Sequence, residues 1–181
     1  MEAPEQLDEE GTPLTKVLVE LRQEVGTTGE RLWARQVADD LFEIRNVPWY
    51  AHKLNWGDIV RCAGLSPADL PIVREVVERS GHRTVRVFFN EKGVSKDEQE
   101  TILGSLAELQ AFHERHGANF LALDVEPQAD YEAVLAVLVE QSESQRLVFE
   151  EAWRWGADTG FGPSDDPPQE TPTWLGAETS R

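Results

Sequence analysis

The sequence predicts an α+β protein in which a small antiparallel sheet or partial barrel precedes a split βαβ, ferredoxin-like layer. Three observations predict this fold class. Six short segments of alternating apolar and polar side chains lie before residue 90, and many short strands are typical of a curled sheet or barrel. After that point, apolar side chains recur at helical spacing in two segments, and a nearly continuous apolar run lies between them.

The strands of the first part are short, and turn residues separate them. Asp39 and Asp40 join the second strand to the third as a hairpin, and Ser80-Gly81-His82 turns the fifth strand back into the sixth. The six strands are expected at residues 16–22, 30–38, 41–47, 58–63, 71–79 and 83–89.

Two helices and two further strands are expected after residue 90. Ser95 is a good N-cap, and the apolar stripe that follows it runs through Phe112 and ends near Gly117. Asp130 opens the second helix. Residues 119–125 predict a strand covered on both faces, and residues 147–153 predict a strand or a helical continuation, of which we favour the strand. The buried side of the second helix is expected to hold Tyr131, Val134, Leu135, Leu138 and Val139.

The composition divides the chain into one folded domain and two acidic ends. Residues 1–15 hold five acids and no base, and residues 157–181 are rich in Gly, Pro and acid without apolar periodicity. Both segments are expected to be disordered. The domain then spans residues 16–156, with a β-rich part at 16–89 and a βαβαβ part at 83–153 that shares the sixth strand.

The net charge of −17 bounds the classes of partner. About half of it lies in the two ends, and the rest lies in the domain. Nucleic acids and anionic membranes do not attract a net anion, so neither is expected as a partner. A basic protein partner is compatible with this charge, although solubility alone also explains an acidic chain.

The sequence also indicates a cytoplasmic protein. Acids stand where a signal peptide would need a basic start and an apolar run, and no segment approaches the roughly 18 apolar residues of a membrane span. Cys62 is the single cysteine, so no internal disulfide can form. Its place in an alternating strand indicates a small buried side chain.

Three motifs in order carry a resemblance to a known family. They are ERLW at residues 30–33, NVPWY at 46–50 running to GDIV at 57–60, and VERSGHRT at 77–84. In these motifs, over about residues 30–150, the chain resembles an uncharacterised bacterial family, domain of unknown function 4265. The resemblance implies a bacterial cytoplasmic protein. It implies no activity and no functional residue.

The turn SGHRT is the first candidate binding site. Gly81 can adopt a positive φ in a tight turn, and its missing side chain leaves the backbone open to a ligand. Ser80, His82, Arg83 and Thr84 then offer hydroxyls, an imidazole and a guanidinium, which grips carboxylates or phosphates in bidentate fashion. The alternative is a structural turn whose polar side chains cap neighbouring backbone groups.

An aromatic corner is the second candidate. Trp49, Tyr50 and Trp56 lie within eight residues, and Asp58 follows directly. Such residues dominate protein interfaces and could form a stacking platform or a binding anchor. The alternative is a plug for the open end of a small barrel, with Asp58 binding turn amides.

The sequence contains no complete catalytic site, no cofactor-binding glycine loop and no metal-ligand spacing. His52, Asp58 and His82 could form a metal or acid–base site only by converging through folding. The sequence therefore favours a non-enzymatic protein-interaction protein, of which one version is an immunity- or antitoxin-like protein that covers a basic partner. Two alternatives remain open. One is a hydrolase or transferase with His82 as general base and Arg83 as anion clamp, and the other is a regulatory module that binds a small ligand.

Overall fold

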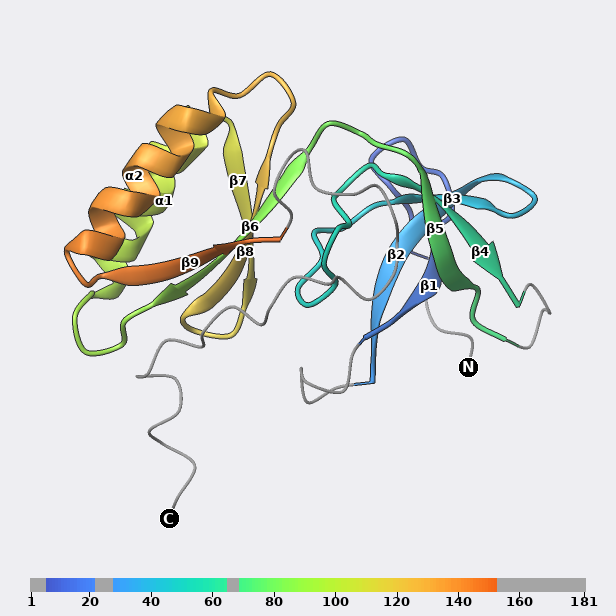
Figure 1. The fold of residues 1–181 in the computed structure, drawn as a ribbon, viewed down its shortest axis with the longest axis horizontal. Coiled ribbons are helices and arrows are strands. Elements are labelled where there is room, and N and C mark those ends of the chain that lie inside the picture. The colour runs from blue at the N-terminus through green and yellow to red at the C-terminus, as the bar shows by residue number, and fades with distance from the viewer. Residues whose placement is uncertain (1–5, 22–27, 65–68, 153–181) are drawn as a thin grey trace, which may run out of the picture.

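The structure is a computed structural model that describes residues 6–21, 28–64 and 69–152. It is an α+β protein with two antiparallel sheets, and the first sheet closes into a barrel. Figure 1 shows the barrel and the second sheet side by side, joined by the segment between β5 and β6.

The barrel consists of five strands, and neighbours in the sequence pair in an antiparallel manner. A parallel contact between Leu18 and Ile72 closes β1 onto β5. The sequence predicts a small antiparallel sheet or partial barrel, whereas the structure has a closed barrel. The strands are β1 (Thr15–Glu20), β2 (Gly29–Ala38), β3 (Leu41–Ile44), β4 (Ile59–Ala63) and β5 (Ile72–Glu78).

Alternation along each strand directs every second side chain into the barrel. In β2, for example, Leu32 and Ala34 are fully buried, whereas Arg31, which precedes Leu32, is exposed. Cys62 belongs to this core, and burial raises the pKa of its thiol to about 12. The thiol therefore stays protonated at neutral pH and is a packing group, as its strand position predicts.

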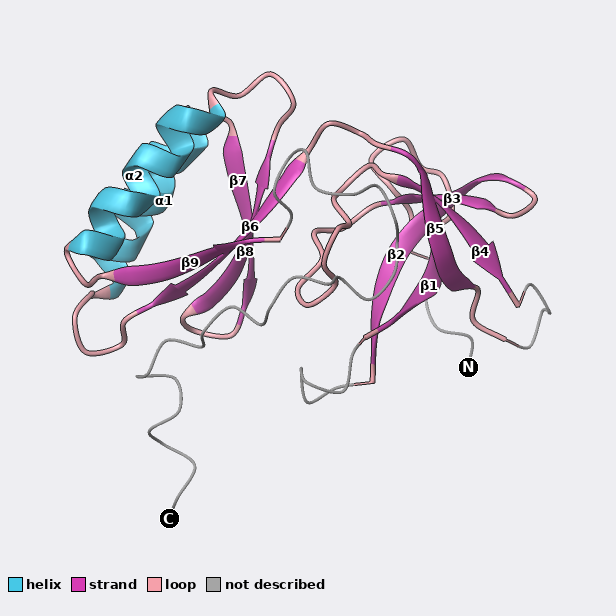
Figure 2. Cartoon of the chain, viewed as in Figure 1, coloured by secondary structure: helices cyan, strands magenta, loops and turns pink. Residues whose placement is uncertain are grey.

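The second part has the element order βαββαβ, with both helices on one face of the sheet (Figures 1 and 2). Its strands lie in the order β7-β8-β6-β9, and all adjacent pairs are antiparallel. The elements are β6 (Arg83–Phe89), α1 (Lys96–Glu108), β7 (Ala111–His116), β8 (Phe120–Val125), α2 (Tyr131–Glu143) and β9 (Leu147–Glu151).

The two faces of this sheet differ in character. In β6, Val85, Val87 and Phe89 pack with the helices in one apolar core. Thr84 and Arg86 alternate with them and therefore lie on the opposite, helix-free face. Both are buried although no helix covers them, because the connection between β3 and β4 packs there.

Helix α1 ends well before the predicted boundary at Gly117. Its C-cap is Leu109, and Gln110 has a φ of 60°, which turns the chain out of the helix. The next six residues form β7, which the sequence analysis misses. The predicted stripe includes Phe112 by its spacing alone, and in the structure that side chain is 48% exposed on the edge strand. The predicted βαβαβ order is therefore corrected to βαββαβ.

Both helix starts are predicted correctly. Ser95 and Glu98 form a capping box at α1, and the carboxylate of Asp130 accepts a hydrogen bond from the backbone N–H of Ala133 at α2. One side chain of α2 is placed wrongly by the periodicity. Val139 is 43% exposed, whereas Val134 and Leu138 are buried.

The predicted hairpin at residues 80–82 is wrong. Strand β5 pairs with β4 and β1, whereas β6 pairs with β8 and β9. The turn therefore carries the chain from the barrel to the second sheet. The predicted hairpin between β2 and β3 is present, with its turn at Asp39 and Asp40.

Residues 6–14, which the sequence analysis assigns to a disordered end, form a turn against the barrel. Asp8 accepts hydrogen bonds from the backbone N–H groups of Glu10 and Thr12. Arg35 of β2 forms ion pairs with Asp8 and Glu10 at 3.3 and 2.7 Å. The expected tail at 157–181 lies outside the described residues. No helix in the described ranges is long and apolar enough to cross a membrane.

Candidate functional site

The predicted site residues gather where the barrel meets the helix-free face of the second sheet. They come from residues 45–58, between β3 and β4, and from residues 79–84, between β5 and β6 and at the start of β6. We call these two segments the joint.

Asp58 is the polar centre of the joint and is 0% exposed. Its carboxylate accepts hydrogen bonds from the backbone N–H groups of Asn55 and Ser80, at 3.0 and 2.9 Å. The guanidinium of Arg79 donates to it at 2.9 Å. Burial raises the pKa of Asp58, while the Ser80 N–H and Arg79 act in the opposite direction. Asp58 therefore binds turn amides, and it links the two segments of the joint.

The hydroxyl of Ser80 is part of the same network. Its Oγ donates to the backbone carbonyl of Trp56 at 2.6 Å and lies 3.2 Å from Asp58 Oδ1. It also accepts a hydrogen bond from the backbone N–H of His82 at 3.2 Å. The hydroxyl therefore fixes the backbone in this structure.

Two glycines let these segments approach each other. Gly57 has a φ of 76°, and a Cβ added there would lie 3.0 Å from the Cβ of Ser80. Gly81 has a φ of 87°, and a Cβ there would lie 3.3 Å from Pro127. Both the backbone conformation and the close contact thus require glycine.

His82 pairs with Asp124 of β8. Its Nδ1 lies 2.9 and 3.0 Å from the two carboxylate oxygens, and both side chains are largely buried. An ionised carboxylate only accepts hydrogen bonds, so the ring proton lies on Nδ1 and neutral His82 presents Nε2 as an acceptor. The ring also contacts Trp56, with 4.7 Å between ring centroids.

Asp124 is one of the site residues that sequence reasoning misses. A signal was available, because Asp124 is the only charged residue in the apolar run of residues 119–125. A carboxylate inside a strand that is covered on both faces requires a partner.

Thr84 lies on the helix-free face and is buried. Its backbone N–H donates to the side-chain oxygen of Asn55 at 3.0 Å. Among the described residues, its Oγ1 is buried without a hydrogen-bond partner. Thr84 and Arg83 point to opposite faces of β6, so the SGHRT residues do not converge on one ligand site.

A buried carboxylate fixes the aromatic corner. Glu30 of β2 accepts hydrogen bonds from the backbone N–H groups of Trp49, Tyr50 and Ala51, at 2.6, 3.0 and 2.8 Å. The carbonyl of Ala51 in turn accepts a hydrogen bond of 2.5 Å from Arg86. Sequence reasoning misses Glu30, because one acid in an alternating strand has no distinctive signal.

The three aromatic side chains of the corner lie in different places. The ring of Trp49 packs against His116 and Phe120 of the second sheet, with centroid distances of 5.1 and 5.5 Å. The hydroxyl of Tyr50 lies 3.4 Å from His116 Nε2. Trp56 lies instead beside His82, and the guanidinium of Arg45 covers its ring at 4.6 Å. The corner connects the barrel to the sheet.

The residues considered for a metal do not converge. Asp58 binds Arg79 and Ser80, His82 binds Asp124, and His52 is an exposed residue 3.8 Å from Glu150. Within the described ranges, no group of three or more His, Cys, Asp or Glu side chains is arranged to hold a metal ion.

Comparison with known proteins identifies the family. Residues 30–149 match the model of a family described as a domain of unknown function, DUF4265. The chain belongs to the DUF4265 family. The family expected from the three motifs is thereby confirmed, and the DUF4265 segment includes Glu30, Asp58, His82 and Asp124.

The fold of this DUF4265 protein has a solved counterpart. A crystal structure described as that of a hypothetical protein from Neisseria gonorrhoeae is similar to it, with a TM-score of 0.66 and 21% sequence identity. The similarity covers 82% of this chain and 97% of the other. At this identity the likeness shows the fold alone. No curated protein matches the chain.

Proposed function

We propose that this protein is a non-enzymatic interaction protein of the bacterial cytoplasm, and that its two helices cover a basic protein partner. The observation that carries the proposal is the charge of the helical layer. The helices α1 and α2 with their N-caps present eight exposed acids and one base, Lys96. The acids are Asp97, Glu98, Glu100, Glu108, Asp130, Glu132, Glu140 and Glu143.

Most of these acids form no ion pair with another residue of the described ranges. Glu100 forms an ion pair with Arg115 at 2.7 Å, and in the described part of the chain it is the only one of the eight in an ion pair. The acidic surface therefore belongs to the folded domain as well as to the chain ends. A basic surface on a partner would be complementary to it.

Some of these acids oppose the stability of their own helices. Glu108 is the last residue of α1, Glu140 and Glu143 lie in the last turn of α2, and neither last turn contains a base. A negative charge near a helix C-terminus is unfavourable by about 0.3–1 kcal/mol at low ionic strength. Helix stability thus does not explain these residues, whereas a basic partner would make use of their charge.

An apolar contact is available inside the acidic surface. Val139 is 43% exposed on α2, and Ala136, one turn earlier, is also exposed. Interfaces combine a small apolar centre with a polar rim. One version of the proposal is an immunity- or antitoxin-like protein, for which complementary charge speeds association with a basic toxin. The βαββαβ order and the strand order β7-β8-β6-β9 support a ferredoxin-like layer as the scaffold.

Charge reversal on α2 tests the proposal. The protein copurified from the native bacterial host is identified, and its affinity is measured for the double variant Glu140→Lys, Glu143→Lys. A matched control carries Glu9→Lys and Glu78→Lys, two exposed acids beside and on the barrel. We expect the helix variant to lose about tenfold or more in affinity and the control to lose much less. An acidic partner, or equal losses in both variants, would overturn the proposal.

The His82–Asp124 pair supports a second candidate, a hydrolase or transferase with His82 as general base. The carboxylate orients the imidazole, as the acid of a catalytic dyad does. Turnover of p-nitrophenyl acetate and p-nitrophenyl phosphate is compared between the native protein and His82→Gln. A loss of about a hundredfold would support this candidate, and equal rates would remove it.

A further inference from the structure

Strand β9 is an open edge of the second sheet, and α2 packs on it (Figure 1). The N–H of Ala152 donates to the carbonyl of Thr84, and the N–H of Asn90 donates to the carbonyl of Arg146. Even-numbered residues of this strand therefore bind β6. The backbone groups that point to the open side belong to Leu147, Phe149 and Glu151. In the described ranges no strand pairs with β9 on that side, so the edge can accept an added strand.

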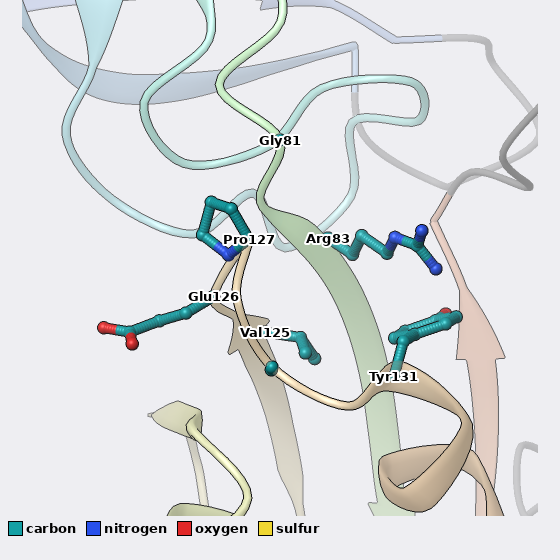
Figure 3. A pocket seen from close by; sticks show the side chains of 7 residues that line it. Gly81, Arg83, Val125, Glu126, Pro127 and Tyr131 are labelled. Carbon is teal, nitrogen blue, oxygen red and sulfur yellow. The ribbon is translucent and has the colours of Figure 1, made fainter.

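The flank of α2 above this edge is apolar in its middle. The hydroxyl of Tyr131 donates to Glu151 at 2.8 Å, which sets the start of the helix beside β9. Figure 3 shows Tyr131 at this start, next to Arg83. Residues four apart lie on the same side of a helix, so Leu135 and Val139 continue the flank along the strand. Leu135 is half-buried, and Val139 is 43% exposed.

Both ends of α2 are acidic. Glu132 lies in its first turn and Glu143 is its last residue, and both are exposed. The helix contains no base, and among the described residues neither acid forms an ion pair. A segment with apolar side chains in the middle and basic side chains at its ends is therefore complementary to this flank.

The other open edge of the sheet differs in charge. Helix α1 packs on β7, and its Glu100 is already paired with Arg115 of that strand at 2.7 Å. Lys96 lies one turn before Glu100 on the same side of α1. A basic segment is thus complementary to the β9 edge and not to the β7 edge.

We propose that β9 binds an extended segment of the basic partner, which adds a strand to the sheet beneath α2. The backbone of the segment would bond to the open groups of Leu147, Phe149 and Glu151. The 13 residues of α2 span about 20 Å, and about seven residues of a strand cover the same length. The inference rests on the proposed function, because it specifies how the partner meets the acidic helix α2.

Hydrogen exchange followed by ¹⁵N NMR tests this inference on the full chain with a synthetic peptide. The peptide Lys-Thr-Val-Thr-Val-Thr-Lys, with blocked ends, has two Val between two Lys on one face and only Thr on the other. For a dissociation constant on the order of 1 mM, about 10 mM peptide should slow exchange about tenfold at the amides of Leu147, Phe149 and Glu151. The amides of Val148 and Glu150 already bind β6 and should not change.

Two control peptides separate charge from strand addition. Glu in place of both Lys keeps the strand and reverses the charge, and it should weaken binding at least about tenfold. Pro in place of both Val keeps the charge, but it removes backbone donors and should abolish the slowed exchange.

A matched pair of variants assigns the contact to α2. Val139→Lys removes an apolar group above the edge and adds a repelling charge, and it should weaken peptide binding about tenfold. Val77→Lys makes the same change on β5 of the barrel, where the side chain is 46% exposed, and should have no effect. For the copurified partner as well, only Val139→Lys should lose affinity.

Unchanged exchange at the three amides, or equal slowing by the acidic or the proline peptide, would overturn the inference. Exchange that is already slow in the free protein would show that another part of the chain or a second copy covers the edge, and would also contradict it. The proposed function fails separately. If Glu140→Lys, Glu143→Lys loses the partner while the peptide leaves β9 unchanged, the helices bind the partner without β9. If that variant keeps the partner while the peptide binds β9, the edge binds a strand but the acidic helices do not hold the partner.

Discussion

His82 Nδ1 lies 2.9 Å from Asp124 Oδ1, and this pair links the turn that leaves the barrel to a central strand of the second sheet. Hydrogen bonds centred on Asp58 and Glu30 fix the same region from the barrel side. The joint is thus held by polar side chains that serve backbone groups. The joint contains residues of two of the three family motifs. These residues bind partners, such as Asp124, that lie outside the motifs.

The His82–Asp124 pair should show a measurable coupling energy. His82→Gln and Asp124→Asn each disrupt the hydrogen bond between imidazole and carboxylate, and the double variant should be more stable than the sum of the single losses predicts. We expect a coupling of about 0.5–3 kcal/mol in urea denaturation. Strict additivity would show that the contact contributes nothing to the stability of the joint.

Glu30→Gln should destabilise the fold by about 2 kcal/mol or more, because a buried N–H group without an acceptor is costly. The Trp49 N–H binds one carboxylate oxygen and the N–H groups of Tyr50 and Ala51 bind the other, so the amide nitrogen that replaces one oxygen leaves one or two of these N–H groups without an acceptor. Glu100→Gln is the control, since its ion pair with Arg115 is at the surface and should contribute less than about 1 kcal/mol. Equal midpoints in urea for the two variants would argue against Glu30 as the anchor of the corner.

Two glycine substitutions should have opposite signs. Gly57→Ala places a side chain at a positive φ and 3.0 Å from Ser80, so we expect a loss of about 1–2 kcal/mol. Gly104 lies within α1 with nothing within 4 Å of an added Cβ, so Gly104→Ala should stabilise the fold by up to about 1 kcal/mol. Thermal unfolding of both variants measures the difference. A stabilised Gly57→Ala would contradict the close approach of the two segments.

Glu114 should make the stability depend on pH. Burial raises the pKa of this carboxyl, and the charge of Asp124 adds to the rise, while the N–H of Val47 lowers it. The folded state therefore binds the proton more tightly than the unfolded state. The stabilisation is fully present below the unfolded pKa of about 4.3 and is lost as the pH rises through the folded value.

Glu114→Gln removes this titration and keeps an oxygen for the Val47 N–H. The stability of the variant relative to the native protein should therefore increase from pH 4 to pH 7 in urea denaturation. A constant difference across this range would show that the folded pKa of Glu114 is not raised.

The sequence predicts the elements whose signals are local. Alternation identifies all five barrel strands and β6, and Ser95 and Asp130 mark both helix starts. Strand β7 is missed, because Phe112 continues the helical spacing of α1 and only the positive φ of Gln110 separates the two elements. The sequence predicts the position of the SGHRT turn correctly, but it predicts a hairpin between the two flanking strands, which do not pair. Strand pairing depends on contacts between residues that are distant in sequence.

The site is less predictable than the fold for the same reason. His82 and Asp58 are recognisable as polar residues at a turn, whereas their roles depend on Asp124, Arg79 and Ser80 in three dimensions. Glu30 carries no local signal at all. A buried carboxylate that binds distant backbone amides becomes apparent only when the loop is folded against its strand.

The association rate with the copurified basic partner tests the central claim most directly. The rate is measured for the full chain, for Glu140→Lys, Glu143→Lys and for Glu9→Lys, Glu78→Lys, at low and physiological ionic strength. Charges on the helical layer should steer association, so the native rate should fall as salt shortens the screening length to about 8 Å. The helix variant should be about tenfold slower at low salt and less sensitive to salt than the control variant. A native rate that does not change with salt, and that both variants share, would contradict the proposal that the acidic helices cover a basic partner.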